Sequence, residues 1–93
     1  MIKSFASKET KKVYNQEFSK HLPGNIQHIA LRKLIMLDNA ACVEDLSSPP
    51  GNHSEKLSGD REGQYSIRVN SQFRICFSFS DGEAKDVEIV DYH

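Results

Sequence analysis

The sequence of 93 residues has no tryptophan, only two cysteines and no long apolar run. Cys42 and Cys76 lie far apart and lack the spacing of a zinc site, so we expect two reduced thiols and no metal. No stretch approaches the ~18 apolar residues of a membrane span, and the first residues do not resemble a signal peptide. These absences predict a cytoplasmic protein that needs no cofactor and contacts no membrane.

A surplus of one charge is also missing, since 12 Lys and Arg stand against 13 Asp and Glu. A net charge of −1 argues against a protein that binds nucleic acid by bulk electrostatics alone. The acidic residues are concentrated at residues 81–93, which hold five of them and one lysine. A mildly basic body with an acidic end allows an anion in one cleft and a basic partner elsewhere.

Hydrophobic periodicity predicts the elements of one domain covering residues 1–93. The spacing predicts a short strand at residues 2–5, a helix from Ser7 to Phe18 and a buried helix from Ile26 to about Leu46. Alternation predicts strands at 64–70, 72–79 and 84–91, the first two joined by a two-residue turn at 70–71. The fold class is therefore expected to be α+β: a short N-terminal strand, two helices, then an antiparallel three-stranded meander packed on the helices.

Two arginines are expected on the polar face of this meander. Arg68 and Arg74 alternate with apolar residues, so both should project from the face that the helices do not fill and lie near one another across the turn. Adjacent cations require an anion, which Asp91 or a bound phosphate would supply. A solvated face with a cross-strand salt bridge explains the same pattern equally well.

The chain ends on Asp91-Tyr92-His93, directly after a strand that should anchor it beside the sheet. Histidine is suited to proton transfer near neutral pH, tyrosine donates hydrogen bonds, and aspartate orients an imidazole or an arginine. With Arg74, these groups suit metal-free RNA cleavage. A base takes the proton of the 2′-OH, an arginine stabilises the phosphorane, and an acid protonates the leaving oxygen. A frayed terminal histidine without a role is the alternative.

The loop at residues 51–63 offers further contacts to phosphate or base through His53, Lys56 and Arg61. Local composition favours instead a polar surface loop shaped by glycines, with Asp60 and Arg61 as a local ion pair.

Four segments, in order, resemble the HigB branch of the RelE/ParE toxin superfamily: Gly59-Asp60-Arg61-Glu62-Gly63, the strands around Arg68 and Arg74, and the closing Asp91-Tyr92-His93. The resemblance runs from about Pro49 to the end, and the first half matches in helix layout. It implies a RelE-like fold and a toxin of a type II toxin–antitoxin system. Such a toxin is a ribosome-dependent, metal-independent endoribonuclease that cuts mRNA in the ribosomal A site and inhibits translation.

The resemblance also implies partners and residue roles. The partners are a HigA-like helix-turn-helix antitoxin, the 70S ribosome with its mRNA, and operator DNA reached only through the antitoxin complex. We predict catalytic roles for Arg74, Asp91, Tyr92 and His93, and contacts to RNA or phosphate for His53, Lys56, Arg61 and Arg68. The sequence departs from the family at Ser58, where members often carry a lysine before Gly-Asp-Arg, and at Glu55, where some carry a histidine.

Two other functions remain open at this point. One is a non-enzymatic inhibitor on the same scaffold, in the manner of ParE-like gyrase poisons. Ser58 favours it, whereas a positioned imidazole at His93 disfavours it. The other is a plain interaction module, in which the acidic last strand receives a basic segment of a partner.

Overall fold

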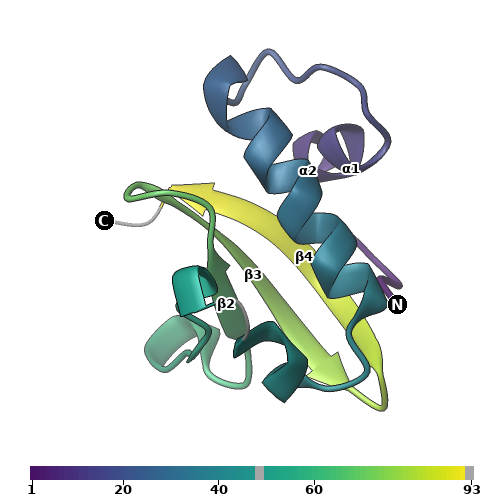
Figure 1. Cartoon of the computed structure of the whole chain (residues 1–93), viewed down its shortest axis with the longest axis vertical. Coiled ribbons are helices and arrows are strands. Elements are labelled where there is room, and N and C mark those ends of the chain that lie inside the picture. The colour runs from purple at the N-terminus through teal and green to yellow at the C-terminus, as the bar shows by residue number, and fades with distance from the viewer. Residues whose placement is uncertain (48–49, 92–93) are drawn as a thin grey trace.

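The computed structural model describes residues 1–47 and 50–91. Two helices, α1 (Lys8–Tyr14) and α2 (Gly24–Asn39), precede a sheet of β1 (Glu55–Lys56), β2 (Tyr65–Arg68), β3 (Phe73–Ser80) and β4 (Glu83–Asp91). The strands lie in the order β1-β2-β3-β4, and each pair of neighbours is antiparallel. Figure 1 shows α2 crossing one face of the sheet with α1 beside it. The predicted α+β class is confirmed, and β1 extends the predicted meander by one short strand.

The core lies between α2 and the face of the sheet that carries the alternating apolar residues. Leu34 and Leu37 of α2 are fully buried, as are Ile67 of β2 and Ile75 and Phe77 of β3. Ile67 and Ile75 pair directly across the hairpin, so their side chains share this face. Their immediate sequence neighbours Arg68 and Arg74, which pair with one another, therefore project from the other face, as expected. None of the helices in residues 1–47 and 50–91 is long and apolar enough to cross a membrane.

The β2–β3 turn is longer than predicted by one residue. Val69 donates its backbone N–H to the carbonyl of Phe73, so the turn covers residues 70–72. Its shape comes from Asn70, whose side-chain oxygen accepts from the backbone N–H groups of Gln72 (2.9 Å) and Phe73 (2.7 Å). The prediction of a two-residue turn was wrong, because this asparagine stabilises a wider loop. The extra residue puts Arg68 directly opposite Arg74.

The second helix is shorter than predicted, ending at Asn39 instead of near Leu46. After it, a carboxylate oxygen of Asp45 accepts hydrogen bonds from the backbone N–H groups of Ala41 (2.9 Å) and Cys42 (3.3 Å). These bonds favour the short 3₁₀ helix η1 (Val43–Ser47) over another α-helical turn. The same bonds hold the pKa of Asp45 below its ordinary value.

The outer edge of β4 is occupied from Ala84 to Ile89, although β4 ends the sheet. The N-terminal segment lies parallel to it through the bridges Ile2–Ala84 and Phe5–Val87, where a strand was predicted. Asp86, with a φ of +54°, interrupts the ladder between these two bridges. Beyond them, Thr10 of α1 accepts a hydrogen bond from the backbone N–H of Ile89 (2.9 Å). The first helix thus completes an edge that would otherwise be open to another strand.

Candidate functional site

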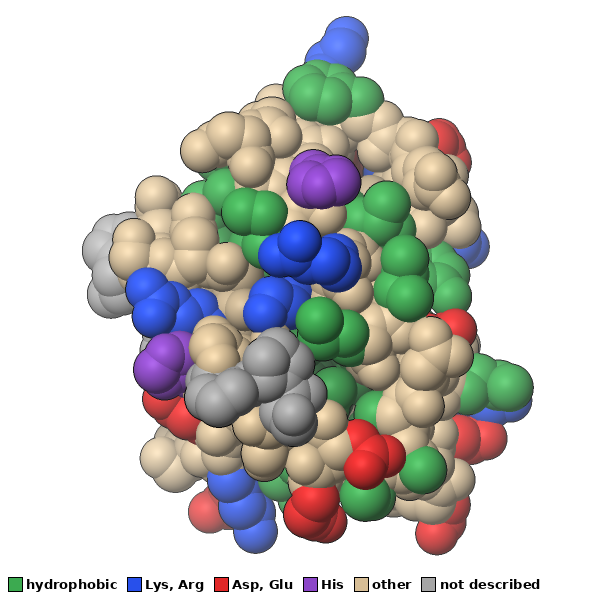
Figure 2. Space-filling model, viewed as in Figure 1, with side chains coloured by type: hydrophobic (Ala, Val, Ile, Leu, Met, Phe, Trp, Pro, Cys, Tyr) green, Lys and Arg blue, Asp and Glu red, His purple; other side chains and the backbone are tan. Residues whose placement is uncertain are grey.

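A hollow of about 240 Å³ opens beside the turn of the β2–β3 hairpin. Its lining consists of charged and polar residues: His53, Glu55, Arg68, Asn70, Ser71 and Arg74. They come from the loop before β1, from β1 itself, and from both strands and the turn of the hairpin. Figure 2 shows Lys and Arg side chains gathered across the middle of one face, from α2 towards β2. Two arginines and a histidine beside a concave surface supply the donors that bind an anion.

The Arg74 guanidinium is held rigidly. The residue is 8% exposed, and its Nε donates to the hydroxyl of Ser66 at 2.7 Å. One terminal nitrogen donates to the backbone carbonyl of His53 and, more weakly, to that of Ser66 at 3.4 Å. His53 has a φ of +43°, a left-handed conformation that residues other than glycine rarely adopt. Arg74 therefore connects β3, β2 and the loop before β1, and places a fixed positive charge in the lining of the hollow.

The Arg68 guanidinium is less constrained. Its Nε donates to the carbonyl of Asn70 at 3.1 Å, which orients the planar group over the turn. Within the described part of the chain, its terminal nitrogens have no hydrogen-bond partner. Arg68 lies directly opposite Arg74, so the expected proximity of the two arginines is confirmed. A phosphate in the hollow would find a preoriented charged donor in Arg68.

Asp91, the last residue described, lies at the exposed end of β4. The register pairs it with Phe73, whereas Arg74 pairs with Val90. Partners in register share a face, so the side chains of Asp91 and Arg74 leave the sheet on opposite faces, contrary to the expectation of a shared one. A carboxylate oxygen of Asp91 accepts from the side-chain amide of Gln72 at 3.0 Å. Tyr92 and His93 lie outside the described residues, and their catalytic roles remain predictions.

Arg61 does not line the hollow. Its terminal nitrogens contact Gln64 at 3.0 Å and Glu88 of β4 at 3.2 Å, in place of the local ion pair with Asp60 suggested by the sequence. The contact with Glu88 attaches η3 (Gly59–Arg61) to the face of the sheet that carries Arg68 and Arg74, opposite the core. Glu88 pairs there with the fully buried Cys76. Burial raises the pKa of the Cys76 thiol, which disfavours a nucleophilic thiolate.

Two further predictions concern Lys56 and metal binding. Lys56 is exposed on β1 and lies outside the lining of the hollow. Contacts of Lys56 and Arg61 to RNA therefore remain predictions. Among the described residues, no group of three or more His, Cys, Asp or Glu side chains could hold a metal ion.

The sequence analysis missed three residues of the lining: Glu55, Asn70 and Ser71. Asn70 and Ser71 belong to the predicted turn next to Arg68, and this adjacency could have identified them. Glu55 lies in the hollow because β1 pairs with β2, where Glu55 is opposite Ser66. A two-residue strand carries no periodic signal, so the pattern could not have placed Glu55 there.

The family described as the RelE-like toxin of type II toxin-antitoxin system HigB matches residues 3–93. The chain is 46% identical to Toxin HigB-1 of Vibrio cholerae over 63 residues, which cover 68% of this chain and 66% of that protein. It is 32% identical to Endoribonuclease HigB of Proteus vulgaris over 93 residues, the whole length of both.

Solved structures with a similar fold include two toxin–antitoxin complexes from Staphylococcus aureus. The YoeB–YefM complex matches with a TM-score of 0.62 at 18% identity, over 100% of this chain and 98% of the other. A heterotetrameric complex of the YoeB–YefM toxin–antitoxin matches with a TM-score of 0.56 at 19% identity, with the same coverage. At this level of identity, the likeness concerns the fold alone.

Proposed function

Because the chain belongs to the HigB family of RelE-like toxins, we propose that it is the toxin of a type II toxin–antitoxin pair and cleaves mRNA as an endoribonuclease. The observation that carries this function is the hollow at the β2–β3 hairpin. There Arg68 and Arg74 lie directly opposite one another beside His53. A buried, hydrogen-bonded guanidinium next to a more accessible one suits a phosphate whose negative charge increases during the reaction.

In the proposed reaction, the scissile phosphate of the RNA occupies this hollow. The 2′-OH attacks the phosphorus and loses its proton to a base, while the bond to the 5′ oxygen breaks and that oxygen gains a proton. The products are a 2′,3′-cyclic phosphate and a 5′-OH. Arg68 and Arg74 stabilise the charge of the phosphorane, and losing one such donor typically costs about 10²- to 10³-fold in rate. His53, Tyr92 and His93 are the candidates for proton transfer and for orienting the attacking group, whereas the Asp91 side chain leaves the sheet on the face opposite Arg74 and accepts from Gln72.

The substrate is proposed to be mRNA in the A site of the 70S ribosome, in the cytoplasm. A protein of net charge −1 has little bulk attraction for free RNA, so a ribosome that presents the strand compensates for weak intrinsic affinity. A HigA-like helix-turn-helix antitoxin is the proposed inhibitor, with operator DNA contacted only through the complex. The similarity of the fold to toxins solved with their antitoxins supports an antitoxin partner.

The test is cleavage in a bacterial translation extract, with the 5′ ends of the mRNA mapped by primer extension. We expect cuts at the codon in the A site, and no cuts in the same mRNA without ribosomes. Arg68→Ala should reduce the rate about 10²-fold or more. Lys85→Ala is the matched control, because it removes the same charge from an exposed residue of β4 outside the hollow.

Three outcomes would contradict parts of the proposal. Intact mRNA in an extract whose translation is arrested would favour the non-enzymatic inhibitor. Equal losses in the Arg68 and Lys85 variants would show that overall charge, and not the hollow, determines the activity. Cleavage of naked mRNA at the same rate would refute the dependence on the ribosome. His93→Ala belongs in the same series, and an unchanged rate would remove His93 from the catalytic set.

A further inference from the structure

A buried polar link connects α2 to the loop that carries His53. The ammonium of Lys33 donates a hydrogen bond to the side-chain oxygen of Asn52, the last residue of η2 (Pro50–Asn52). Lys33 is 8% exposed and Asn52 is 0% exposed. The amide nitrogen of Asn52 donates to the carbonyl of Leu46 at 3.1 Å and lies 3.8 Å from the sulfur of Met36. Both ends of the Asn52 side chain are therefore hydrogen-bonded inside the protein.

The link continues along the backbone into the hollow. Asn52 directly precedes His53, whose backbone has a left-handed φ of +43° and whose carbonyl accepts from the guanidinium of Arg74. A residue other than glycine keeps such a conformation only where its surroundings determine it. The backbone of His53 is held on one side by the hydrogen bond from Arg74 to its carbonyl. It is held on the other side by the bond between Lys33 and the preceding residue, Asn52. Glu55, two residues further on, lines the same hollow.

A buried lysine is a poor means of stabilising a fold. Burial lowers the pKa of Lys33, and the nearby charge of Arg32 lowers it further, so the folded state disfavours its charged form. Replacing such a buried charge together with its partner by apolar residues of similar volume is often neutral or stabilising. What an apolar residue cannot do is bind the oxygen of Asn52 in one defined position. The free-energy cost of burying Lys33 is therefore explained better by the fixed position that it gives Asn52 than by any gain in the stability of the fold.

We propose that Lys33 and Asn52 are positioning residues of the endoribonuclease site, which fix the His53 carbonyl so that it holds the Arg74 guanidinium at the hollow. The inference rests on the proposed function for its effect on cleavage. Its structural part, that Lys33 controls the state of Arg74, can be tested without any substrate.

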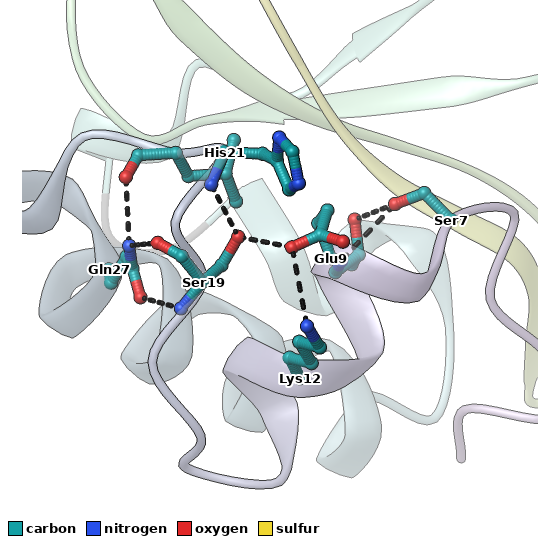
Figure 3. Close-up of polar contacts among 8 residues, drawn as sticks. Ser7, Glu9, Lys12, Ser19, His21 and Gln27 are labelled. Carbon is teal, nitrogen blue, oxygen red and sulfur yellow. Dashed lines mark hydrogen bonds and ion pairs between the residues drawn. The ribbon is translucent and has the colours of Figure 1, made fainter.

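The chain offers a matched control on the same helix. Gln27 is 9% exposed, and its side-chain nitrogen donates to the carbonyls of Ser19 (2.7 Å) and Leu22 (2.9 Å), while its oxygen accepts from the backbone of Ser19 (3.0 Å). Figure 3 shows this clamp, with Ser19 also bound to Glu9 of α1. Gln27 and Lys33 thus both bind a loop to α2, and only Lys33 binds the loop that contacts Arg74.

The experiment compares Lys33→Met with Gln27→Met by two measurements. The first is the single-turnover rate of mRNA cleavage at saturating ribosomes. Misplacing a reacting group by about 1 Å can cost about 10²-fold, so we expect a 10- to 100-fold loss for Lys33→Met and little change for Gln27→Met. The second is the NMR signal of the Arg74 guanidinium, assigned by its loss in Arg74→Lys. Separate signals of slowly rotating terminal nitrogens should persist in Gln27→Met and merge in Lys33→Met.

A pair of variants at Asn52 covers the case in which Lys33→Met does not fold. Asn52→Asp keeps an oxygen for Lys33, whereas Asn52→Leu removes it, and both lose the donor to Leu46. We expect Asn52→Asp to retain more of the cleavage rate and of the separate Arg74 signals than Asn52→Leu does. The proposal is refuted if the folded Lys33 variant keeps the wild-type rate and Arg74 signals, or if the two Asn52 variants behave alike. If the wild-type protein cleaves no mRNA, the proposed function fails, while the NMR comparison still decides the positioning.

Discussion

Replacing Thr10 by valine should destabilise the fold through a single hydrogen-bond acceptor. Thr10 is fully buried between α1 and β4. Its hydroxyl oxygen accepts from the backbone N–H of Ile89 at 2.9 Å and lies 2.7 Å from the hydroxyl of Ser7, the N-cap of α1. Valine has nearly the same shape, so the change removes the oxygen without leaving a cavity.

The expected loss in the free energy of unfolding follows from the backbone N–H of Ile89, which loses its acceptor. Ile89 is buried in β4, and its N–H would face the added methyl group of valine. An unsatisfied buried donor costs about 1–3 kcal/mol, and a domain of this size is stable by only about 5–15 kcal/mol. One kcal/mol shifts the Tm of such a domain by about 4–8 °C, so the variant should melt at least about 4 °C lower.

The assay is urea unfolding followed by circular dichroism, together with amide hydrogen exchange of Ile89. Thr10→Ser is the control, because it keeps the acceptor and loses one methyl group, worth about 0.8 kcal/mol of burial. We expect Thr10→Val to lose more stability than Thr10→Ser, and only the valine variant to speed exchange at Ile89. An unchanged urea midpoint, or a greater loss in the serine variant, would show that the hydroxyl at this edge adds no net stability.

Three other results are expected. The pKa of Asp45 is lowered in the folded state, so its ionised carboxylate stabilises the fold above the ordinary aspartate pKa, and this stabilisation is lost as the pH falls through the lower folded-state value. Asp45→Ala should therefore weaken the dependence of the unfolding free energy on pH below about pH 4. An unchanged pH dependence in urea titrations over this range would contradict the prediction. Leu34→Ala should lower the free energy of unfolding by about 2–5 kcal/mol, because Leu34 is fully buried, whereas Ile35→Ala at an exposed position should cost less than about 1 kcal/mol in the same denaturation assay. Iodoacetamide should modify exposed Cys42 in the native protein and spare buried Cys76, and equal labelling by mass spectrometry would show that Cys76 is accessible.

Most of the sheet was predictable because its signals are local. Alternation along β2 and β3 identified the core face, with Ile67 and Ile75 buried and Arg68 and Arg74 on the other side. The proximity of the two arginines was confirmed, although the predicted two-residue turn would have paired Arg68 with Phe73. The wider turn made by the Asn70 side chain restores agreement between register and alternation. The apolar pattern specified the faces more reliably than the turn composition did.

The end of α2 was less predictable because two signals compete there. Apolar residues continue past Asn39 to Leu46, which is itself buried, so the helical pattern extends further than the helix. The side chain of Asp45 takes the backbone N–H groups of Ala41 and Cys42, and that local bonding decides the conformation. A single carboxylate that bonds to nearby backbone N–H groups can thus compete with helical periodicity.

The segment before β2 was the least predictable part, and it supplies two of the six residues that line the hollow, His53 and Glu55. Its position depends on side-chain contacts with distant residues: Lys33 with Asn52, Arg74 with His53, and Arg61 with Glu88. None of these pairs follows a helical or strand period, so the sequence presents them as ordinary polar residues.

The same distinction separates what the fold requires of the sequence from what the site requires. The core requires only apolar residues of suitable period, and the likeness to YoeB at 18% identity shows how weakly that constrains sequence. The loop contacts require particular partners, such as Asn52 for Lys33 and the carbonyl of His53 for Arg74. We therefore expect differences in cleavage among members of the HigB family to follow the residues that fix this loop, Lys33 and Asn52 here, more closely than the residues of the core.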